Sequence, residues 1–99
     1  MRLSTQEQKS IITNFKQIFP YAKLYLFGSR VDDTKKGGDI DLYIETHSSE
    51  YSYSKLLDFN SLVQEEIGLQ KIDIVINKLD KKTDKSIYIN AKKQGVLLG

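Results

Sequence analysis

GGDIDLYIE, residues 37–45, is the stretch of this sequence that decides its fold. From Asp39 to Glu45 apolar and polar side chains alternate, which is the two-residue period of a strand with one packed face. The packed face would hold Ile40, Leu42 and Ile44, and the other face Asp39, Asp41, Tyr43 and Glu45. The stretch therefore predicts a strand that presents carboxylates on the side away from its core.

The segments upstream of this strand predict a helix and a second strand. Ser4 followed by Glu7 is a capping-box pattern, and apolar residues at helical spacing come after it. Together they predict a helix over residues 5–19, which Pro20 ends because proline cannot continue a helix. The period then changes to two, which predicts a strand that ends at Gly28.

The segments downstream predict two more helices and one more strand. An apolar stripe at helical spacing predicts a helix over residues 55–67, with Ser54 as its cap and Gly68 as its stop. Alternation returns over residues 71–77 and predicts a third strand. A final helical segment is expected over residues 84–94.

The order of these elements favours one fold class. Helix, strand, strand, helix, strand, helix is typical of a small α/β sandwich of the α+β type, with a short mixed sheet and helices packed on one side. A length of 99 residues fits one domain spanning residues 1–99. The charged segment over residues 30–38 is expected to be an exposed loop with one helical turn.

Composition excludes several classes of function. With 15 Lys and Arg against 13 Asp and Glu, the net charge of +2 disfavours a protein that grips long nucleic acid by charge alone. The absence of Cys excludes disulfides and thiolate sites, and a single His leaves oxygen atoms as the ligands for any metal. No apolar run approaches the ~18 residues that a membrane span needs, so a soluble, cytoplasmic protein is expected.

Three aspartates are candidates for chemistry. Asp39 and Asp41 lie two apart, so both side chains leave the same face of their strand. Asp73 lies on the polar face of a later strand that could pair with the first. Taken singly, each has an ordinary explanation as a solvated residue of a half-exposed strand. Taken together they repel one another unless a cation joins them, and oxygen ligands favour Mg²⁺ or Mn²⁺, which recruit phosphate oxygens.

Gly28-Ser29-Arg30 directly follows the first predicted strand. Glycine lets a backbone approach a ligand closely, and a hydroxyl and a guanidinium are both good donors to phosphate. The alternative is a plain turn after a strand, which is common. Neither the P-loop pattern nor the dinucleotide-binding glycine pattern occurs, so another way of binding phosphate is needed.

This ordered set resembles the minimal nucleotidyltransferases of the DNA polymerase beta superfamily. The resemblance rests on Gly28-Ser29 in LYLFGSR, Asp39-Ile40-Asp41 in GGDIDLYIE and Asp73, and it covers roughly residues 24–77. Two features depart from the family pattern: the loop before Asp39 is slightly short, and Gly38 stands where a small polar residue is more usual.

The resemblance implies a mechanism and a set of site residues. Two Mg²⁺ ions, with Mn²⁺ as an alternative, would lie between the carboxylates and the triphosphate of ATP, and AMP would pass to an acceptor hydroxyl. Asp39 and Asp41 would bridge both ions, and Asp73 would complete the ion that activates the acceptor. Gly28 and Ser29 would hold a phosphate. Arg30 would neutralise the departing pyrophosphate, or is a solvated loop arginine.

The resemblance also implies a partner. Small stand-alone members pair with a HEPN-domain toxin, and the nucleotidyltransferase places AMP on a tyrosine of that toxin, acting as its antitoxin. The alternative is a non-catalytic antitoxin that masks its partner by contact alone, which the altered loop motivates. Transfer to a small molecule or to RNA is disfavoured because no second domain forms an acceptor cleft.

Several other features have two interpretations. Tyr51 and Tyr53 could stack a base or pack over the edge of the core. The lysine-rich run over residues 78–85 could contact RNA or form a solvated face. The segment VLLG, residues 96–99, with the preceding stripe Ile87, Tyr88 and Ala91, could dock a partner or seal the sheet.

Overall fold

The structure is a computed structural model that describes residues 1–32, 34, 38–81 and 85–99. Helical and extended segments follow in the predicted order, with a 3-10 turn after the first strand and a short strand added at the end of the chain. Their bounds are α1 Thr5–Ile18, β1 Lys23–Phe27, η1 Gly28–Val31, β2 Ile40–Thr46, α2 Tyr53–Ile67, β3 Ile72–Lys78, α3 Ser86–Gln94 and β4 Val96–Leu97.

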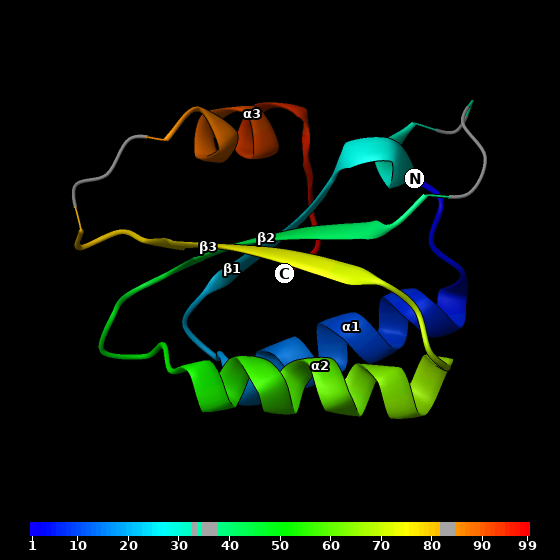
Figure 1. Ribbon diagram of the computed structural model, residues 1–99, viewed down its shortest axis with the longest axis horizontal. Helices are drawn as coiled ribbons and strands as arrows, with labels where there is room; N and C mark the ends of the chain where they lie inside the picture. Colours follow the sequence, from blue (N-terminus) through cyan, green and yellow to red (C-terminus); the bar gives the residue numbers. More distant parts are fainter. Residues whose placement is uncertain (33, 35–37, 82–84) are drawn as a thin grey trace.

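The strands form a mixed sheet in the order β3-β2-β1-β4 (Figure 1). β1 pairs antiparallel with β2 and with β4. β2 pairs in parallel with β3, and α2 makes the crossover that a parallel connection requires. Because β2 and β3 are parallel, their amino ends lie side by side at the same end of the sheet.

The main core lies between one face of the sheet and the helices α1 and α2. The aromatic ring of Phe15 on α1 packs against Phe19 and against Phe59 on α2, with centroids 5.7 and 6.1 Å apart. The predicted apolar face of β2 is fully buried in this core. The buried residues of this core are Ile11, Phe15, Phe19, Leu24, Leu26, Ile40, Leu42, Ile44, Phe59 and Val63.

The helix ends follow local chemistry, with one correction. The capping box of α1 is present: the Ser4 hydroxyl accepts from the Glu7 backbone N–H, and the Glu7 carboxylate accepts from the Ser4 N–H. The expected cap Ser54 of α2 is wrong, because Ser52 caps it by accepting from the Lys55 N–H at 3.2 Å. Gly68 ends α2 as predicted, with φ of 88°.

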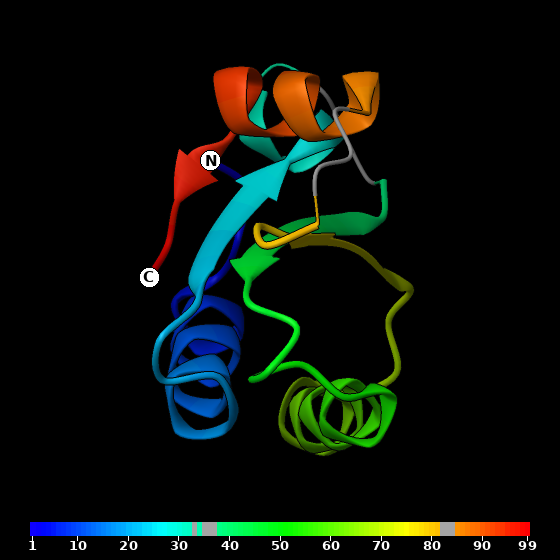
Figure 2. The ribbon, with the colours of Figure 1, turned by 90° about the vertical axis from the view of Figure 1, so that its left-hand side faces the viewer.

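The expected fold class, a small α+β domain with a mixed sheet, is confirmed. α3 departs from the expected arrangement, because α1 and α2 cover one face of the sheet and α3 lies over the other (Figure 2). α3 packs there through Tyr88 and Ala91 against Tyr25 and Tyr43. Residue 84, where this helix was expected to begin, lies outside the described residues.

The last residues of the chain seal one edge of the sheet. Val96 and Leu97 pair with Leu26 and Tyr25 as the edge strand β4. Sealing, which was one of two interpretations of VLLG, is therefore what the segment does here. None of the helices formed by the described residues has the length and apolar character needed to cross a bilayer.

Candidate functional site

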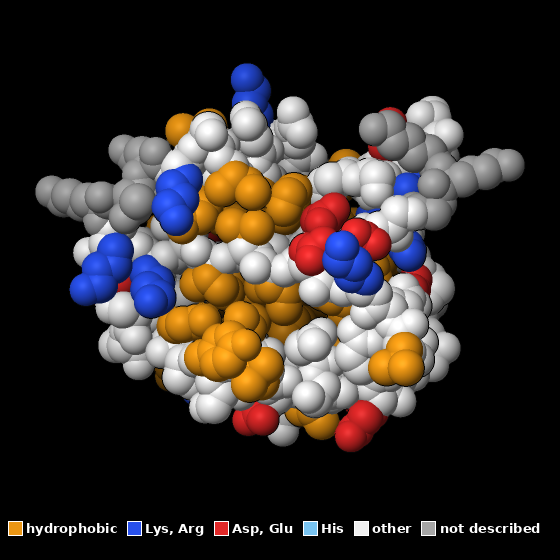
Figure 3. All heavy atoms as spheres, viewed as in Figure 1, with side chains coloured by type: hydrophobic (Ala, Val, Ile, Leu, Met, Phe, Trp, Pro, Cys, Tyr) orange, Lys and Arg blue, Asp and Glu red, His pale blue; other side chains and the backbone are white. Residues whose placement is uncertain are grey.

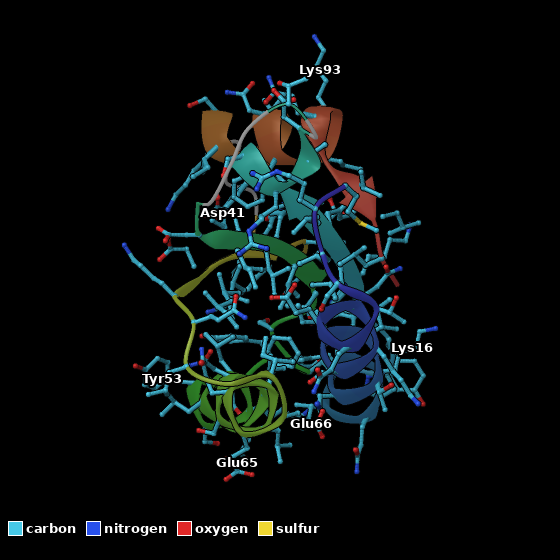
Figure 4. All side chains as sticks on the ribbon, turned by 90° about the vertical axis from the view of Figure 1, so that its right-hand side faces the viewer. Lys16, Asp41, Tyr53, Glu65, Glu66 and Lys93 are labelled. Atoms are coloured by element: carbon cyan, nitrogen blue, oxygen red, sulfur yellow. The ribbon has the colours of Figure 1, made fainter. Side chains whose placement is uncertain are left out.

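Two of the predicted aspartates meet across the parallel strands. Asp41 on β2 is the register partner of Asp73 on β3. Residues in register on neighbouring strands share a face, and the strands lie about 4.8 Å apart. Asp41 is half-buried and Asp73 is exposed. Figure 4 shows Asp41 on the side of the sheet that faces η1 and α3, away from α1 and α2.

The electrostatics of Asp41 reflect this crowding. Burial raises the pKa of the Asp41 carboxyl, and the charges of Asp73 and Asp39 raise it further. The Lys71 ammonium acts in the opposite direction but does not cancel these effects. Burial and the two neighbouring carboxylates thus both disfavour the ionised form of Asp41, which is the condition that a bound cation relieves.

The third aspartate is turned toward a lysine. Asp39 immediately precedes β2, and its carboxylate lies 3.4 Å from the Lys71 ammonium, which immediately precedes β3. The side chain of Asp39 is 44 % exposed, so it stands at the rim of the site. Within residues 1–32, 34, 38–81 and 85–99, no three His, Asp or Glu side chains are arranged to hold a metal ion.

Gly28 brings the turn after β1 directly against Asp41. Phe27, the last residue of β1, is the register partner of Asp41, and Gly28 follows it with φ of 76°. A Cβ atom on Gly28 would clash with the Asp41 carboxylate. Both the backbone conformation and the close approach therefore require glycine at this position.

Gly38 makes a similar approach to Ser29. Gly38 has φ of 90°, and a Cβ atom there would clash with the Ser29 hydroxyl. The departure from the family pattern at this position thus has a steric reason in this chain. The described end of the loop before Asp39 lies directly beside the Gly28–Ser29 turn.

Two arginines hold that turn in place. Arg2 donates from its guanidinium to the Ser29 carbonyl at 2.7 Å and from its backbone N–H to the Arg30 carbonyl at 2.6 Å. Arg30 donates from Nε to the Gly38 carbonyl at 3.2 Å and from Nη1 to the Arg2 carbonyl at 2.9 Å, and Nη1 lies 3.8 Å from the Glu7 carboxylate. The Arg30 guanidinium thus has structural partners, and its role toward pyrophosphate stays a prediction.

The donor set fits a divalent cation that prefers oxygen. Asp41 and Asp73 share a face and are close enough to raise the pKa of Asp41. Asp39 lies two residues from Asp41 and would join them by leaving its exposed contact with Lys71. Carboxylates alone, with neither thiolate nor imidazole beside them, suit Mg²⁺ or Mn²⁺.

Sequence reasoning missed three residues that shape this site: Arg2, Gly38 as a steric neighbour of Ser29, and Lys71. A signal for Lys71 was present, because it precedes Asp73 by two residues, as Asp39 precedes Asp41. Pairing the two strands by their aspartates places Lys71 opposite Asp39. The partners of Arg2 lie far along the chain and leave no such signal.

The remaining candidates lie elsewhere. Tyr51 packs against the main core, as one interpretation had it, whereas Tyr53 is 66 % exposed. Both come after the carboxyl end of β2, at the opposite end of the strand from Asp41.

Comparison with protein families identifies the family of this chain. A family model described as "Nucleotidyltransferase domain" matches residues 9–98, which is nearly the whole chain and includes every aspartate of the site and the Gly28–Ser29 turn. Among curated proteins, no sequence matches this chain.

Proposed function

This chain belongs to the nucleotidyltransferase domain family, and on that premise we propose that it transfers AMP from ATP to a hydroxyl group of a partner protein. One observation carries the proposal: Asp41 and Asp73 lie in register beside the Gly28–Ser29 turn. Residues that are far apart in the sequence but form the expected motif thus lie together on one face of the sheet.

The three aspartates would hold the metal. Asp41 and Asp73 would ligate it, and Asp39 would join them. Mg²⁺, with Mn²⁺ as an alternative and two ions in the full site, would supply positive charge against the triphosphate and the leaving pyrophosphate. The raised pKa of Asp41 supports this assignment, because burial and then the charges of Asp73 and Asp39 both disfavour the ionised carboxylate, and a bound cation would offset both effects.

The chain's own residues would then orient the phosphates of ATP and deprotonate the acceptor hydroxyl. The acceptor oxygen forms a bond to the α-phosphorus of ATP as the bond to the bridging oxygen breaks, and pyrophosphate leaves with that electron pair. The acceptor proton passes to the exposed carboxylate of Asp73. The Ser29 hydroxyl would donate to a phosphate oxygen, and Arg30 would add positive charge near the leaving group.

The acceptor in this proposal is a tyrosine of a HEPN-domain toxin, which makes the chain an antitoxin. Support for this finer step comes from the resemblance of Gly28-Ser29, Asp39-Ile40-Asp41 and Asp73 to the motifs of minimal nucleotidyltransferases.

Labelled ATP tests the reaction. The chain, Mg²⁺ and its HEPN partner are incubated with ATP labelled in the α-phosphate or, separately, in the γ-phosphate. Only the α-label should become covalently attached to the partner, because AMP is retained and pyrophosphate departs. Asp41→Asn should abolish labelling, whereas Asp58→Asn, which removes an exposed carboxylate on α2, should not.

Three results would contradict the proposal. Transfer of the γ-label would indicate a kinase reaction. Labelling that survives Asp41→Asn would remove the carboxylate from the chemistry. An unlabelled partner after incubation with the wild-type chain would leave no transfer to explain.

A contact-only antitoxin is the second candidate. It is favoured by the ion pair between the Asp39 carboxylate and the Lys71 ammonium, which engages one of the three predicted metal ligands. In that case the Asp39→Asn, Asp41→Asn double variant would still protect cells from the toxin. Loss of protection with binding intact would rule this candidate out.

A further inference from the structure

A pocket separate from the aspartate site lies near the carboxyl end of β3. It is a pocket of about 360 Å³ between the end of β3, the segment before α2 and the start of α3. The volume is at the lower end of the range for small-molecule and side-chain sites. The polar and aromatic residues that line it are Tyr51, Asn77, Lys78, Lys81, Lys85 and Tyr88.

The described lining of this pocket is basic. It contains three lysines and no carboxylate. The Lys78 ammonium stands 4.9 Å from the centre of the Tyr51 ring, and the Lys85 ammonium stands 5.8 Å from the centre of the Tyr88 ring. These cation–π contacts hold two ammonium groups against the pocket wall. The pocket is therefore suited to a ligand with negative charge.

The pocket lies at the edge strand β3 and is lined from both faces of the sheet: Tyr51 and Ile76 belong to the main-core side, whereas Tyr88 and Asn77 belong to the side that carries Asp73. Asp73, Val75 and Asn77 alternate onto the same side of β3, and four residues of strand span about 13 Å. Figure 3 shows several basic side chains gathered on the left and a cluster of acidic side chains right of centre, with a basic side chain against it. A ligand seated in the pocket would thus lie a short distance from Asp73 along the strand.

We propose that this pocket, formed around Lys78, Lys81 and Lys85, binds the carboxylates of an acidic segment of the acceptor protein. The segment would hold the acceptor while its hydroxyl lies at Asp73. The acceptor half of this inference rests on the proposed function. Charge complementarity carries the rest, since the described lining of the pocket holds three lysines and no carboxylate.

Single-stranded nucleic acid fits the pocket less well. Its binding depends on open aromatic faces on which bases stack. Here Lys78 and Lys85 each stand over a tyrosine ring, and Tyr51 and Tyr88 are themselves packed against the two clusters of the core. Carboxylates need only the ammonium groups and no stacking surface.

Peptide binding tests the inference without any enzymatic step. Fluorescently labelled hexaglutamate is titrated with the wild-type chain and with a triple variant, Lys78→Gln, Lys81→Gln, Lys85→Gln. The variant lacks the three ion pairs that these lysines would form with glutamates of the peptide. Since each surface ion pair contributes only modestly, the variant should bind about tenfold more weakly. Binding to the wild type should also weaken as salt is added, because salt screens exposed charges.

A matched triple variant controls for net charge. Lys9, Lys16 and Lys93 are exposed and lie on α1 and at the end of α3, away from the pocket. Their joint replacement by Gln removes the same charge and should change hexaglutamate affinity by less than about twofold, since unpaired surface charges act weakly. The single variant Lys81→Glu, at an exposed position, repeats the test if the triple variant is unstable.

Four outcomes would overturn the inference: no saturable binding of hexaglutamate, equal weakening in both triple variants, no weakening in Lys81→Glu, or tighter binding of hexauridylate than of hexaglutamate at equal salt. The last would make the pocket a nucleic-acid site. The Asp41→Asn variant should bind hexaglutamate as the wild type does. If the wild-type chain binds hexaglutamate but transfers no AMP, the proposed function is refuted and the pocket assignment stands.

Discussion

The Asp41 carboxylate has a cost for folding at neutral pH. Its pKa is raised above the ordinary value of 3.8, first by burial and then by the charges of Asp73 and Asp39. A raised pKa means that the folded chain binds this proton more tightly than the unfolded chain does. The stabilisation that results is complete below the ordinary pKa and is lost as the pH rises through the raised value.

Asp41→Asn should therefore stabilise the fold at neutral pH. Like charges on directly opposed strand residues destabilise by about 0.2–1 kcal/mol, so the free energy of unfolding should rise by roughly this amount. Urea denaturation near pH 7 and at about pH 3 measures the effect, and the gain should disappear at the acidic pH, where carboxylates are protonated. If the variant is less stable than the wild type near pH 7, the negative charge of Asp41 makes favourable interactions in the folded chain, and this prediction is wrong.

Gly28→Ala separates crowding at the site from backbone strain. A Cβ atom at Gly28 meets the Asp41 carboxylate, whereas at Gly68, which also has positive φ, it meets nothing within 4 Å. Gly68→Ala should cost about 1 kcal/mol, the strain of positive φ alone. Gly28→Ala should cost about 2–3 kcal/mol, because Asp41 must also move.

Thermal or urea unfolding of the two alanine variants checks this difference. ATP binding in the presence of Mg²⁺ is the second readout: Gly28→Ala should lose it and Gly68→Ala should keep it. Equal costs in unfolding together with equal ATP binding would mean that the turn does not press on the aspartate.

At the level of elements, the amino end of α2 depends on one serine. The Ser52 hydroxyl accepts a hydrogen bond from the Lys55 N–H, and replacement of such a cap by alanine costs about 1 kcal/mol. Ser52→Ala should lower the free energy of unfolding by that amount in urea. Ser54→Ala lies inside the first turn of the same helix and should change it by less than about 0.5 kcal/mol. A larger loss in Ser54→Ala than in Ser52→Ala would mean that Ser54 is the cap.

Local patterns predicted most of the elements. Alternation in GGDIDLYIE and in the segment before Gly28 identified β2 and β1, and the capping box at Ser4 identified α1. β4 was not predicted as a strand, because Val96–Leu97 is too short to show a period and forms only by pairing with β1. The position of α3 on the other face also depends on tertiary packing, which the period of an isolated helix does not reveal.

The site was predictable to the extent that it follows from strand register. The spacing of Asp39 and Asp41, with Asp73 on a strand that could pair, anticipated that Asp41 and Asp73 would share a face. The contact of Asp39 with Lys71 depends on side-chain conformation at the exposed strand ends. Arg2 reaches the turn across the fold, so no local pattern could indicate it.

At the scale of the whole molecule, the two faces of the sheet differ in what they carry. One face is covered by α1 and α2 and contains the main core, the other carries Asp41 and Asp73, and the lysine pocket lies at the edge strand β3 between the two (Figure 2). Because the aspartates lie outside the core, their substitution should alter ligand binding without unfolding the chain.

Calorimetric titration of ATP is the most direct test of the claim that the aspartates form a metal–nucleotide site. Wild-type chain and Asp58→Asn should bind ATP with similar affinity when Mg²⁺ is present and should lose that binding when EDTA removes the metal. Asp41→Asn should bind at least about tenfold more weakly, because it removes a charged ligand from the ion. Binding that is independent of Mg²⁺, or equal in Asp41→Asn and the wild type, would contradict the account.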